Sequence, residues 1–307
     1  MPGGFTVTAT DGTNDISAWR GTLTASLLGG TNTVYLADEG NLNLWIGGGD
    51  NTITADEFVG MRVTMLEGAG GTTVISGGDI GDVLEFLGSE PDLIAVITES
   101  AGLNATWAGG SLEVERVGEI GVEDGATVDA SALSADLSIG TVFAGGPNTT
   151  VIGGASGIEV VGQGQFFGGP GNDYFEFFEF VEGGAVVDFG AGDNVFEVYQ
   201  YDAIQDDVVV TGGEGQNQFY VYSMDFSQRS DMGVVRITDF ADDDSLRIEV
   251  PSFVGIYNPE LDFTFIEDIE ANQVEIRLGE WTLVILENRS SVPEGAIDAF
   301  YYPEEFR

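Results

Sequence analysis

Residues 168–176 read GGPGNDYFE and combine the residue types that hold a hard cation in a tight turn. Glycine lets backbone carbonyls converge, and the aspartate at the sixth position, Asp173, would add carboxylate oxygens. The apolar side chain at the eighth position would then enter the core of a stacked parallel β structure. The pattern Gly-Gly-x-Gly-x-Asp-x-(apolar)-x therefore predicts a cation-binding corner between two strands.

Looser copies of this corner recur along the chain. Longer copies read GGDIGDVL at 77–84, FGAGDNVF at 189–196 and GGEGQNQF at 212–219, and the last two have Asn at the sixth position. A shorter class keeps the glycine punctuation and reads GGTNTV, GGDNTI and GGPNTT at 29–34, 48–53 and 145–150. Successive corners lie roughly 19 to 23 residues apart, which is the spacing expected for one coil of a stacked repeat.

The elements that would position these corners are almost entirely strands and turns. Short alternating runs are bounded by Gly, Asn, Asp or Ser, and no capped segment of about ten residues predicts a helix. Near residue 230 the glycine spacing stops, and 273–278 and 281–286 read as paired strands joined by Gly279-Glu280. We expect an all-β, right-handed parallel β-solenoid (β-roll or β-helix) of about 20 residues per coil over residues 1–230, with a C-terminal β cap over residues 231–307.

Composition narrows the setting of this fold. The chain has 46 Gly, no Cys and no His among 307 residues, and its nine basic residues are all Arg. A formal net charge of −43 predicts strong self-repulsion unless cations screen it. The same charge disfavours nucleic acid and anionic membranes as partners, because no basic patch is available for phosphates.

Targeting signals are sparse. No apolar stretch approaches the roughly 18 residues of a transmembrane helix. The segment that begins at Met1 lacks the positive and apolar regions of a cleaved secretory signal. The absence of Cys fits either the cytoplasm or an export route that avoids disulfide chemistry.

The corners at 168, 189 and 212, followed by the run ITDF at 237–240 and its acidic loop, resemble the hemolysin-type calcium-binding (RTX) proteins. The likeness covers roughly residues 29 to 250. It implies a secreted protein whose repeats bind calcium outside the cell, and export through a type I channel with an uncleaved C-terminal signal. This chain departs from the family in one respect, because its corners are spaced one per coil instead of back to back.

The resemblance also implies a ligand set. It consists of Asp173, Asp193, Asp82 and Asp79 with the backbone carbonyls of Gly169 and Gly171. Asn194 and Asn217 replace the charged ligand on neighbouring coils, which would weaken calcium binding. In the alternative interpretation, Asn172, Asn194 and Asn217 form stacks of side-chain hydrogen bonds or serve the turn geometry. The run Asp242–Asp244 is a separate calcium candidate or a solvated loop.

Alignment of the corners predicts two aromatic sets on opposite faces of the strands. The inward set is Phe175, Phe196 and Phe219, with Phe177, Val198 and Val221. The outward band is Phe178, Tyr199 and Tyr222, with Phe180, Tyr201 and Met224. This band is too apolar for an ordinary surface, so we expect burial by the C-terminal segment (Trp281 and 300–302), self-association, or stacking on sugar rings.

Catalysis meets a compositional obstacle. Without His, Cys or Lys the chain has no imidazole base, thiol nucleophile, Schiff base or P-loop. A paired-carboxylate glycosidase, or a lyase with an Arg base, would have to use Arg62 or Arg116 beside Glu85, Glu113 or Glu115. Ordinary surface pairing explains the same neighbours, since the chain has 52 acidic residues.

The sequence thus predicts a non-enzymatic, secreted acidic protein with an extracellular structural, surface or adhesion role, stabilised by calcium and able to self-associate. The alternative is a carbohydrate-binding or carbohydrate-active (lyase- or epimerase-like) β-helix protein, and a third hypothesis is a targeting part of a larger assembly. What repeats most faithfully is the corner with the phenylalanine after it. The motif therefore indicates coil geometry first and an ion site second.

Overall fold

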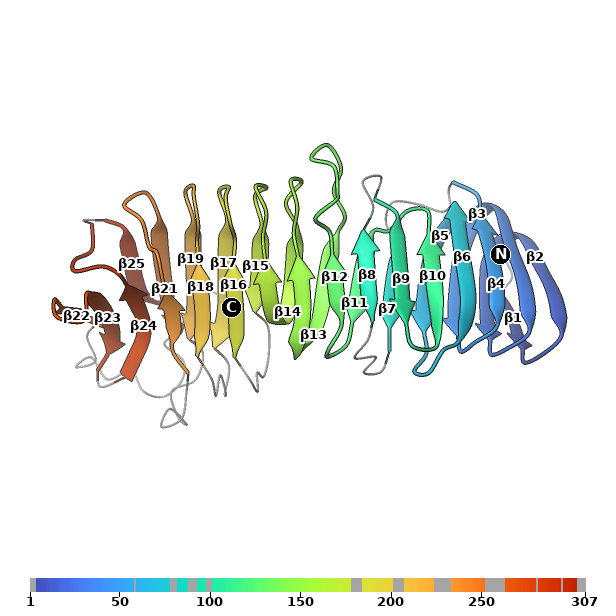
Figure 1. Cartoon of the computed structure of the whole chain (residues 1–307), viewed down its shortest axis with the longest axis horizontal. Helices are drawn as coiled ribbons and strands as arrows, with labels where there is room; N and C mark the ends of the chain where they lie inside the picture. Colours follow the sequence, from blue (N-terminus) through green and yellow to red (C-terminus); the bar gives the residue numbers. More distant parts are fainter. Residues whose placement is uncertain are drawn as a thin grey trace. The chain divides into compact units, whose positions relative to one another are not determined.

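The computed structural model describes residues 4–57, 59–77, 82–87, 93–97, 101–177, 184–200, 207–223, 233–251, 263–279, 281–293 and 295–302. Strands and turns make up these residues, and no helix occurs among them. Most strand pairs are parallel, as expected for an all-β chain that repeats one coil (Figure 1). The chain divides into two compact units, Met1–Ile158 and Glu159–Arg307.

Thirteen strands lie in the described residues of the first unit. They are β1 (Gly4–Ala9), β2 (Thr13–Leu27), β3 (Thr31–Ile46), β4 (Asp50–Ala55), β5 (Val59–Met65), β6 (Gly71–Gly77), β7 (Val83–Phe86), β8 (Ile94–Ile97), β9 (Leu103–Trp107), β10 (Gly110–Val114), β11 (Glu119–Val122), β12 (Thr127–Asp129) and β13 (Thr141–Ile152). Apolar residues stack in register through this unit. One such column, fully buried, contains Ala25, Leu44, Val63, Leu84, Ile120 and Val142.

The parallel order of the first unit is interrupted once. β9 pairs antiparallel with both β8 and β10, while β10 pairs parallel with β6 and β8 pairs parallel with β12. Trp107 at the end of β9 anchors this insertion, since its indole N–H donates to the carbonyl of Ala69 at 2.6 Å and its ring meets Phe86 edge-on. The insertion falls in the part of the sequence with the weakest glycine punctuation.

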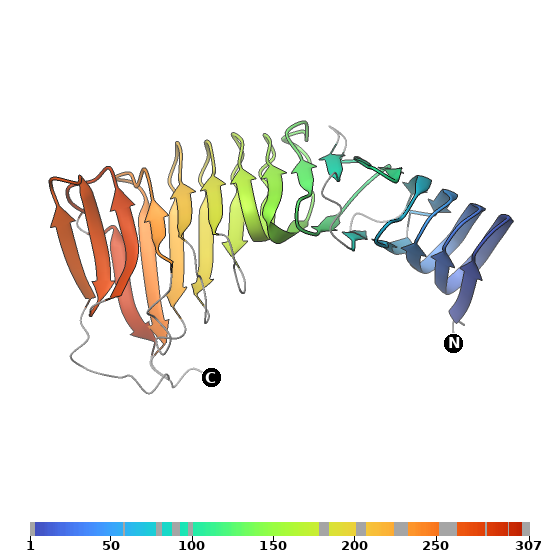
Figure 2. The same cartoon turned by 60° about the horizontal axis from the view of Figure 1, so that its bottom comes forward.

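In the second unit, twelve strands are described. They are β14 (Glu159–Phe167), β15 (Tyr174–Phe177), β16 (Ala185–Asp188), β17 (Val195–Gln200), β18 (Val208–Thr211), β19 (Gln218–Ser223), β20 (Val235–Ile237), β21 (Ser245–Pro251), β22 (Phe263–Asp268), β23 (Gln273–Leu278), β24 (Trp281–Glu287) and β25 (Ile297–Tyr302). β15, β17, β19 and β21 pair in parallel, and so do β16, β18, β20 and β24 (Figures 1 and 2). The antiparallel strands β22, β23 and β24 follow.

The inward aromatic column is confirmed. Phe175, Phe196 and Phe219 are in register and at most 1% exposed, and the rings of Phe175 and Phe196 lie 6.2 Å apart with an interplanar angle of 2°. Phe177, Val198 and Val221 form the second buried column beside them. Period-two alternation along these strands is what places both sets inside.

The predicted hairpin is also confirmed. β23 pairs antiparallel with β24, with Leu278 opposite Trp281, although Glu280 lies outside the described residues. The domain boundary at residue 230 stays a prediction; strands on either side of it pair in parallel, β18 with β20 and β19 with β21.

Candidate functional site

Four side chains at the sixth position of successive corners form the position-six column of the second unit. They are Asp173, Asn194, Asn217 and Asp244, and none is more than 4% exposed. Each comes directly before the first residue of one of the paired strands β15, β17, β19 and β21. The parallel register of those strands therefore places the four side chains one above another. A polar column is therefore buried beside the phenylalanine column.

Hydrogen bonds between successive corners hold the column together. The backbone N–H of Asp173 donates to Asn194 Oδ1 at 2.8 Å, and the backbone N–H of Asn217 donates to Asp244 Oδ1 at 2.8 Å. Between them, Asn194 Nδ2 donates to Asn217 Oδ1 at 3.1 Å. For Asn194 and Asn217 the side-chain stack expected as the alternative to metal binding is present, because a buried N–H needs an acceptor.

The asparagines also reach back to glycine carbonyls within their own turns. Asn194 Nδ2 donates to the carbonyl of Gly192 at 3.0 Å, and Asn217 Nδ2 lies 3.5 Å from the carbonyl of Gly215. The carbonyl at the equivalent place before Asp173 is that of Gly171. An ionised carboxylate has no proton to donate there, so Asp173 differs chemically from its neighbours at this point.

Asp173 packs against the first glycine of its corner. A Cβ on Gly168 would meet Asp173 Oδ2 at 2.3 Å, and a Cβ on Gly212 would meet Asn217 Nδ2 at 2.8 Å. One carboxylate oxygen therefore stands where the corner at 212–219 has an amide nitrogen. This oxygen accepts the backbone N–H of Gly169 at 3.2 Å.

Two of the predicted backbone ligands lie in the same corner. The carbonyl of Gly169 accepts the N–H of Ala191 at 2.9 Å. The carbonyl oxygen of Gly171 lies close to Gly192 in the next corner, since a Cβ added to Gly192 would lie 2.2 Å from this oxygen. Gly192 also has a φ of 111°, so only glycine fits at this position.

The remaining predicted ligands have the following places in the structure. Asp193 is exposed, and its Oδ1 accepts the N–H of Gln216 at 2.9 Å. Asp82 belongs to the first unit, where its Oδ1 accepts the N–H of Met61 at 2.7 Å. Asp79 lies outside the described residues. Over the described ranges, no group of three or more His, Cys, Asp or Glu side chains converges.

The acidic loop at the last corner is tied down by protein groups. Asp244 Oδ2 accepts the N–H of Ala241 at 2.7 Å, and burial raises the pKa of this carboxyl. Asp239 accepts the N–H groups of both Gly212 and Gly213, at 2.7 and 2.8 Å. Arg289 pairs with Asp242 and donates to the carbonyl of Phe240. The segment 239–244 is thus an anchored corner.

The outward aromatic band is confirmed where it is described. Tyr199 and Tyr222 are opposite one another on β17 and β19, and their rings stack 4.6 Å apart at an interplanar angle of 11°. Their predicted companions Phe178, Phe180, Tyr201 and Met224 lie outside the described residues. Whether the C-terminal segment covers the band therefore stays a prediction.

Glutamates border this band. Tyr199 donates to Glu197 at 3.2 Å, and Tyr174 donates to Glu176 at 3.1 Å. Burial and the carboxylates of Glu197 and Glu249 raise the pKa of Tyr222 to about 12. Burial, followed by the nearby glutamates, also raises the pKa values of Tyr174 and Tyr199. The phenols on this face are therefore hydrogen-bond donors at neutral pH.

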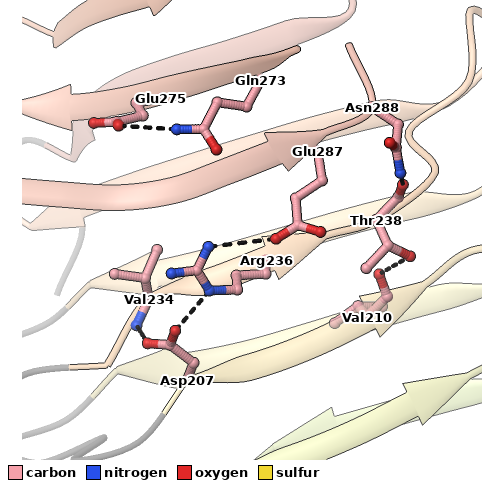
Figure 3. Close-up of polar contacts among 9 residues, drawn as sticks. All are labelled: Asp207, Val210, Val234, Arg236, Thr238, Gln273, Glu275, Glu287 and Asn288. Atoms are coloured by element: carbon pink, nitrogen blue, oxygen red, sulfur yellow. Dashed lines mark hydrogen bonds and ion pairs between the residues drawn. The ribbon is translucent and has the colours of Figure 1, made fainter. Parts of the chain in front are cut away.

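An ion network joins β20 and β24 to Asp207, the residue directly before β18 (Figure 3). Arg236 on β20 reaches Asp207 Oδ2 at 2.6 Å and Glu287 Oε1 on β24 at 3.3 Å. Asp207 Oδ1 also accepts the N–H of Val234 at 2.9 Å. Burial opposes ionisation of Asp207, but the Arg236 and Val234 hydrogen bonds outweigh it and lower its pKa.

A second polar column, in the first unit, was not predicted. It contains Asn14, Asn32, Asn51 and Thr73, and each Asn Nδ2 donates to the next side chain at 2.8 to 3.0 Å. Asn32 and Asn51 are at most 2% exposed. The sequence signal for this column lies in the shorter corners GGTN and GGDN, where one residue separates Asn from the preceding pair of glycines.

The residues considered for catalysis lie on the surface. Arg62 pairs with Glu85 at 3.5 Å, with the arginine side chain 56% exposed. Glu115 accepts the N–H of Gly77 at 3.1 Å, and Glu113 and Arg116 are exposed.

Among the described residues, no helix is long and apolar enough to cross a membrane. Comparison with known proteins adds no relative: no family model and no curated protein matches this chain.

Proposed function

We propose that this chain is a secreted, acidic, RTX-like protein with an extracellular structural, surface or adhesion role, and that calcium stabilises its fold. We further propose a right-handed parallel β-solenoid as its architecture. Register supports the coil length, since Asn32 lies opposite Asn51, Phe175 opposite Phe196, and Phe196 opposite Phe219. A right-handed crossover is the sense expected for parallel strands.

The observation that carries the calcium proposal is Asp173 within the position-six column. Asn194 and Asn217 satisfy glycine carbonyls with an amide, whereas Asp173 presents only oxygens when ionised. Calcium binds carboxylate and carbonyl oxygens, so Asp173 with the carbonyls of Gly169 and Gly171 would hold it. The bound ion would neutralise a carboxylate that is 2% exposed.

The charge of the chain supports the same proposal. A net charge of −43 opposes compaction, and any cation that binds the folded state more tightly than the unfolded state shifts the equilibrium toward folding. Low calcium would keep the chain open for export, and external calcium would close it. Calcium would thus stabilise the folded state in two ways, by specific binding at Asp173 and by general screening of the repulsion between acidic side chains.

Thermal unfolding of the wild type and Asp173→Asn, each with calcium and with chelator at equal ionic strength, tests both contributions. Asn fits this position because the neighbouring coils carry it, so we expect the variant to fold. Calcium should raise the melting temperature of the wild type by several degrees more than that of the variant. An equal rise in both proteins would refute the site at Asp173, and an unchanged wild type would refute calcium stabilisation altogether.

Carbohydrate binding is a second candidate, favoured by the tyrosine and glutamate face of β15, β17 and β19. Phenol groups and carboxylates alternate there, and this combination recognises the apolar faces and hydroxyl groups of sugars. Isothermal titration with neutral and acidic polysaccharides tests it. We expect Tyr222→Ala to weaken binding at least tenfold and Phe167→Ala, an exposed aromatic on β14, to leave it unchanged. Absence of binding to every polysaccharide would refute this candidate.

A further inference from the structure

The strands at the beginning of the first unit leave one edge of the parallel stack without a strand partner. β1 pairs with the residues Thr22–Leu27 of β2, and the residues Thr13–Ala18 of β2 pair with β3. Within the described ranges, the register gives β1 and Thr13–Ala18 no strand on their other side (Figure 1). An edge of this kind is a template for another strand.

The direction of the backbone groups on β1 follows from one hydrogen bond. The carbonyl of Ala9 accepts the N–H of Leu28 at 2.8 Å, so the polar groups of Ala9 face β2. Backbone groups alternate sides along a strand, so those of Thr6 and Thr8 face the outer edge. The side chains of both threonines are exposed. Two residues thus offer N–H and C=O groups to a further strand.

The apolar core is open at the same edge. Phe5 lies in register with Leu23, which is 1% exposed, yet Phe5 itself is 59% exposed. Trp19 on β2 is 71% exposed. Phe5 therefore occupies a core-facing position that has a neighbour on one side only, and covering it would remove apolar surface from water.

Few charged residues lie near this edge. Residues 4–36 contain two acidic side chains, Asp11 and Asp15, and one basic side chain, Arg20, whereas the whole chain has a net charge of −43. β1 itself has no charged residue and no proline, the features that commonly block pairing at an edge. Two copies of this chain would meet little charge repulsion at this edge.

We propose that a second copy of this chain pairs with β1 edge to edge, in antiparallel orientation about a two-fold axis. Thr6 of each copy would lie opposite Thr8 of the other and exchange backbone hydrogen bonds, and Val7 would lie opposite Val7. Phe5 and Val7 of both copies would then share one face of a continuous sheet. The inference gives a specific form to the self-association expected from the sequence, and it depends on neither calcium nor export.

Disulfide trapping tests the register directly, because the chain contains no cysteine. Val7 would face Val7 as a non-hydrogen-bonded antiparallel pair, in which the Cα atoms lie about 4.5 Å apart, and a disulfide spans Cα distances of about 4.4–6.8 Å. We expect full-length Val7→Cys, kept in chelator, to oxidise rapidly to a covalent dimer. Thr52→Cys, at an exposed position on β4, is the matched control and should stay monomeric. Equal rates for the two variants would overturn the register.

Sedimentation velocity of the full-length protein in chelator tests the association itself. We expect a monomer–dimer equilibrium that strengthens when salt rises from about 0.05 to 0.5 M, because screening reduces repulsion between the acidic bodies. Thr8→Pro removes an outward N–H and should raise the dissociation constant at least tenfold, whereas Thr8→Val should not. If Thr8→Pro lowers the melting temperature, Thr6→Glu replaces it, because the glutamates of the two copies would then be diagonal neighbours on one face, about 7–8 Å apart, and repel each other. A monomer under all conditions would overturn the proposal while leaving calcium stabilisation intact.

Discussion

Replacement of Asn194 by Ala should destabilise the second unit more than any other single change in the position-six column. Asn194 is fully buried, its Oδ1 accepts the N–H of Asp173, and its Nδ2 donates to the carbonyls of Gly192 and Gly212 and to Asn217 Oδ1. Alanine would leave a buried N–H without its acceptor, which costs about 1–3 kcal/mol, and would remove bonds worth about 0.5–1.5 kcal/mol each. We expect a total of about 3 kcal/mol.

This loss corresponds to a fall of about 6–12 °C in the melting temperature of a unit of this size. Urea unfolding followed by circular dichroism gives the free energy, and differential scanning calorimetry gives the temperature. Asn172→Ala is the matched control, because Asn172 is exposed and its Oδ1 accepts the N–H of Asp193, which water can satisfy. The control should change stability by less than about 0.5 kcal/mol. If the two alanine variants unfold at the same urea concentration, the column is not a stabilising hydrogen-bond network.

Three further predictions concern the core, the ion network and the tyrosine face. Phe196→Ala should cost about 3–5 kcal/mol in urea unfolding, because it empties the middle of the stacked phenylalanine column, whereas Phe167→Ala, at a 38% exposed position, should cost less than about 1 kcal/mol. Arg236→Met should lower the free energy of unfolding by only about 0.5–1 kcal/mol at neutral pH, since the carboxylate partners of Arg236 are more than a third exposed. Because the pKa of Asp207 is lowered in the folded state, this difference should shrink as pH falls through the carboxyl range. A pH-independent difference would contradict the assignment. The raised pKa of Tyr222, to about 12, means that stability should fall as pH rises above about 10, the pKa of an unfolded tyrosine, and Tyr222→Phe should reduce this loss in alkaline melts.

The sequence was sufficient for the all-β class, the parallel register of the phenylalanines and the hairpin of β23 and β24. These follow from local patterns, namely glycine spacing, period-two alternation and a two-residue connection. Phe175, Phe196 and Phe219 align in the sequence as soon as the corners are superposed, and the structure stacks them in the same order.

The antiparallel insertion of β9 could not be predicted in the same way. Leu103–Trp107 reads as an ordinary strand, and its orientation depends on partners that lie on both sides of it, β8 and β10. Pairing direction is a tertiary property that the strand's own residues do not specify. The anchoring contact of Trp107 with Ala69 likewise joins residues 38 positions apart.

The ligand set stays a prediction, and the structure shows only where some of its residues lie. Asp173 and Gly169 share a hydrogen bond in one corner, whereas the other residues were grouped by their place in the motif. Asp82 and Asp173 have the same place in their repeats, yet they accept N–H groups in different units. Sequence similarity between repeats thus identifies equivalent positions, and only the stacking order decides which of them meet.

The antiparallel insertion of β9 has a consequence for how the first unit forms. A stack of identical parallel coils can grow by adding one coil to the last, since each new strand needs only its predecessor as a template. At β10 this growth stops, because Gly110 must find Gly71 while β8 and β9 are placed beside it. The short-range antiparallel pairs β8–β9 and β9–β10 close faster than the long-range parallel ones. We therefore expect this segment to be a separate nucleus, from which coils on either side are templated in opposite directions along the chain.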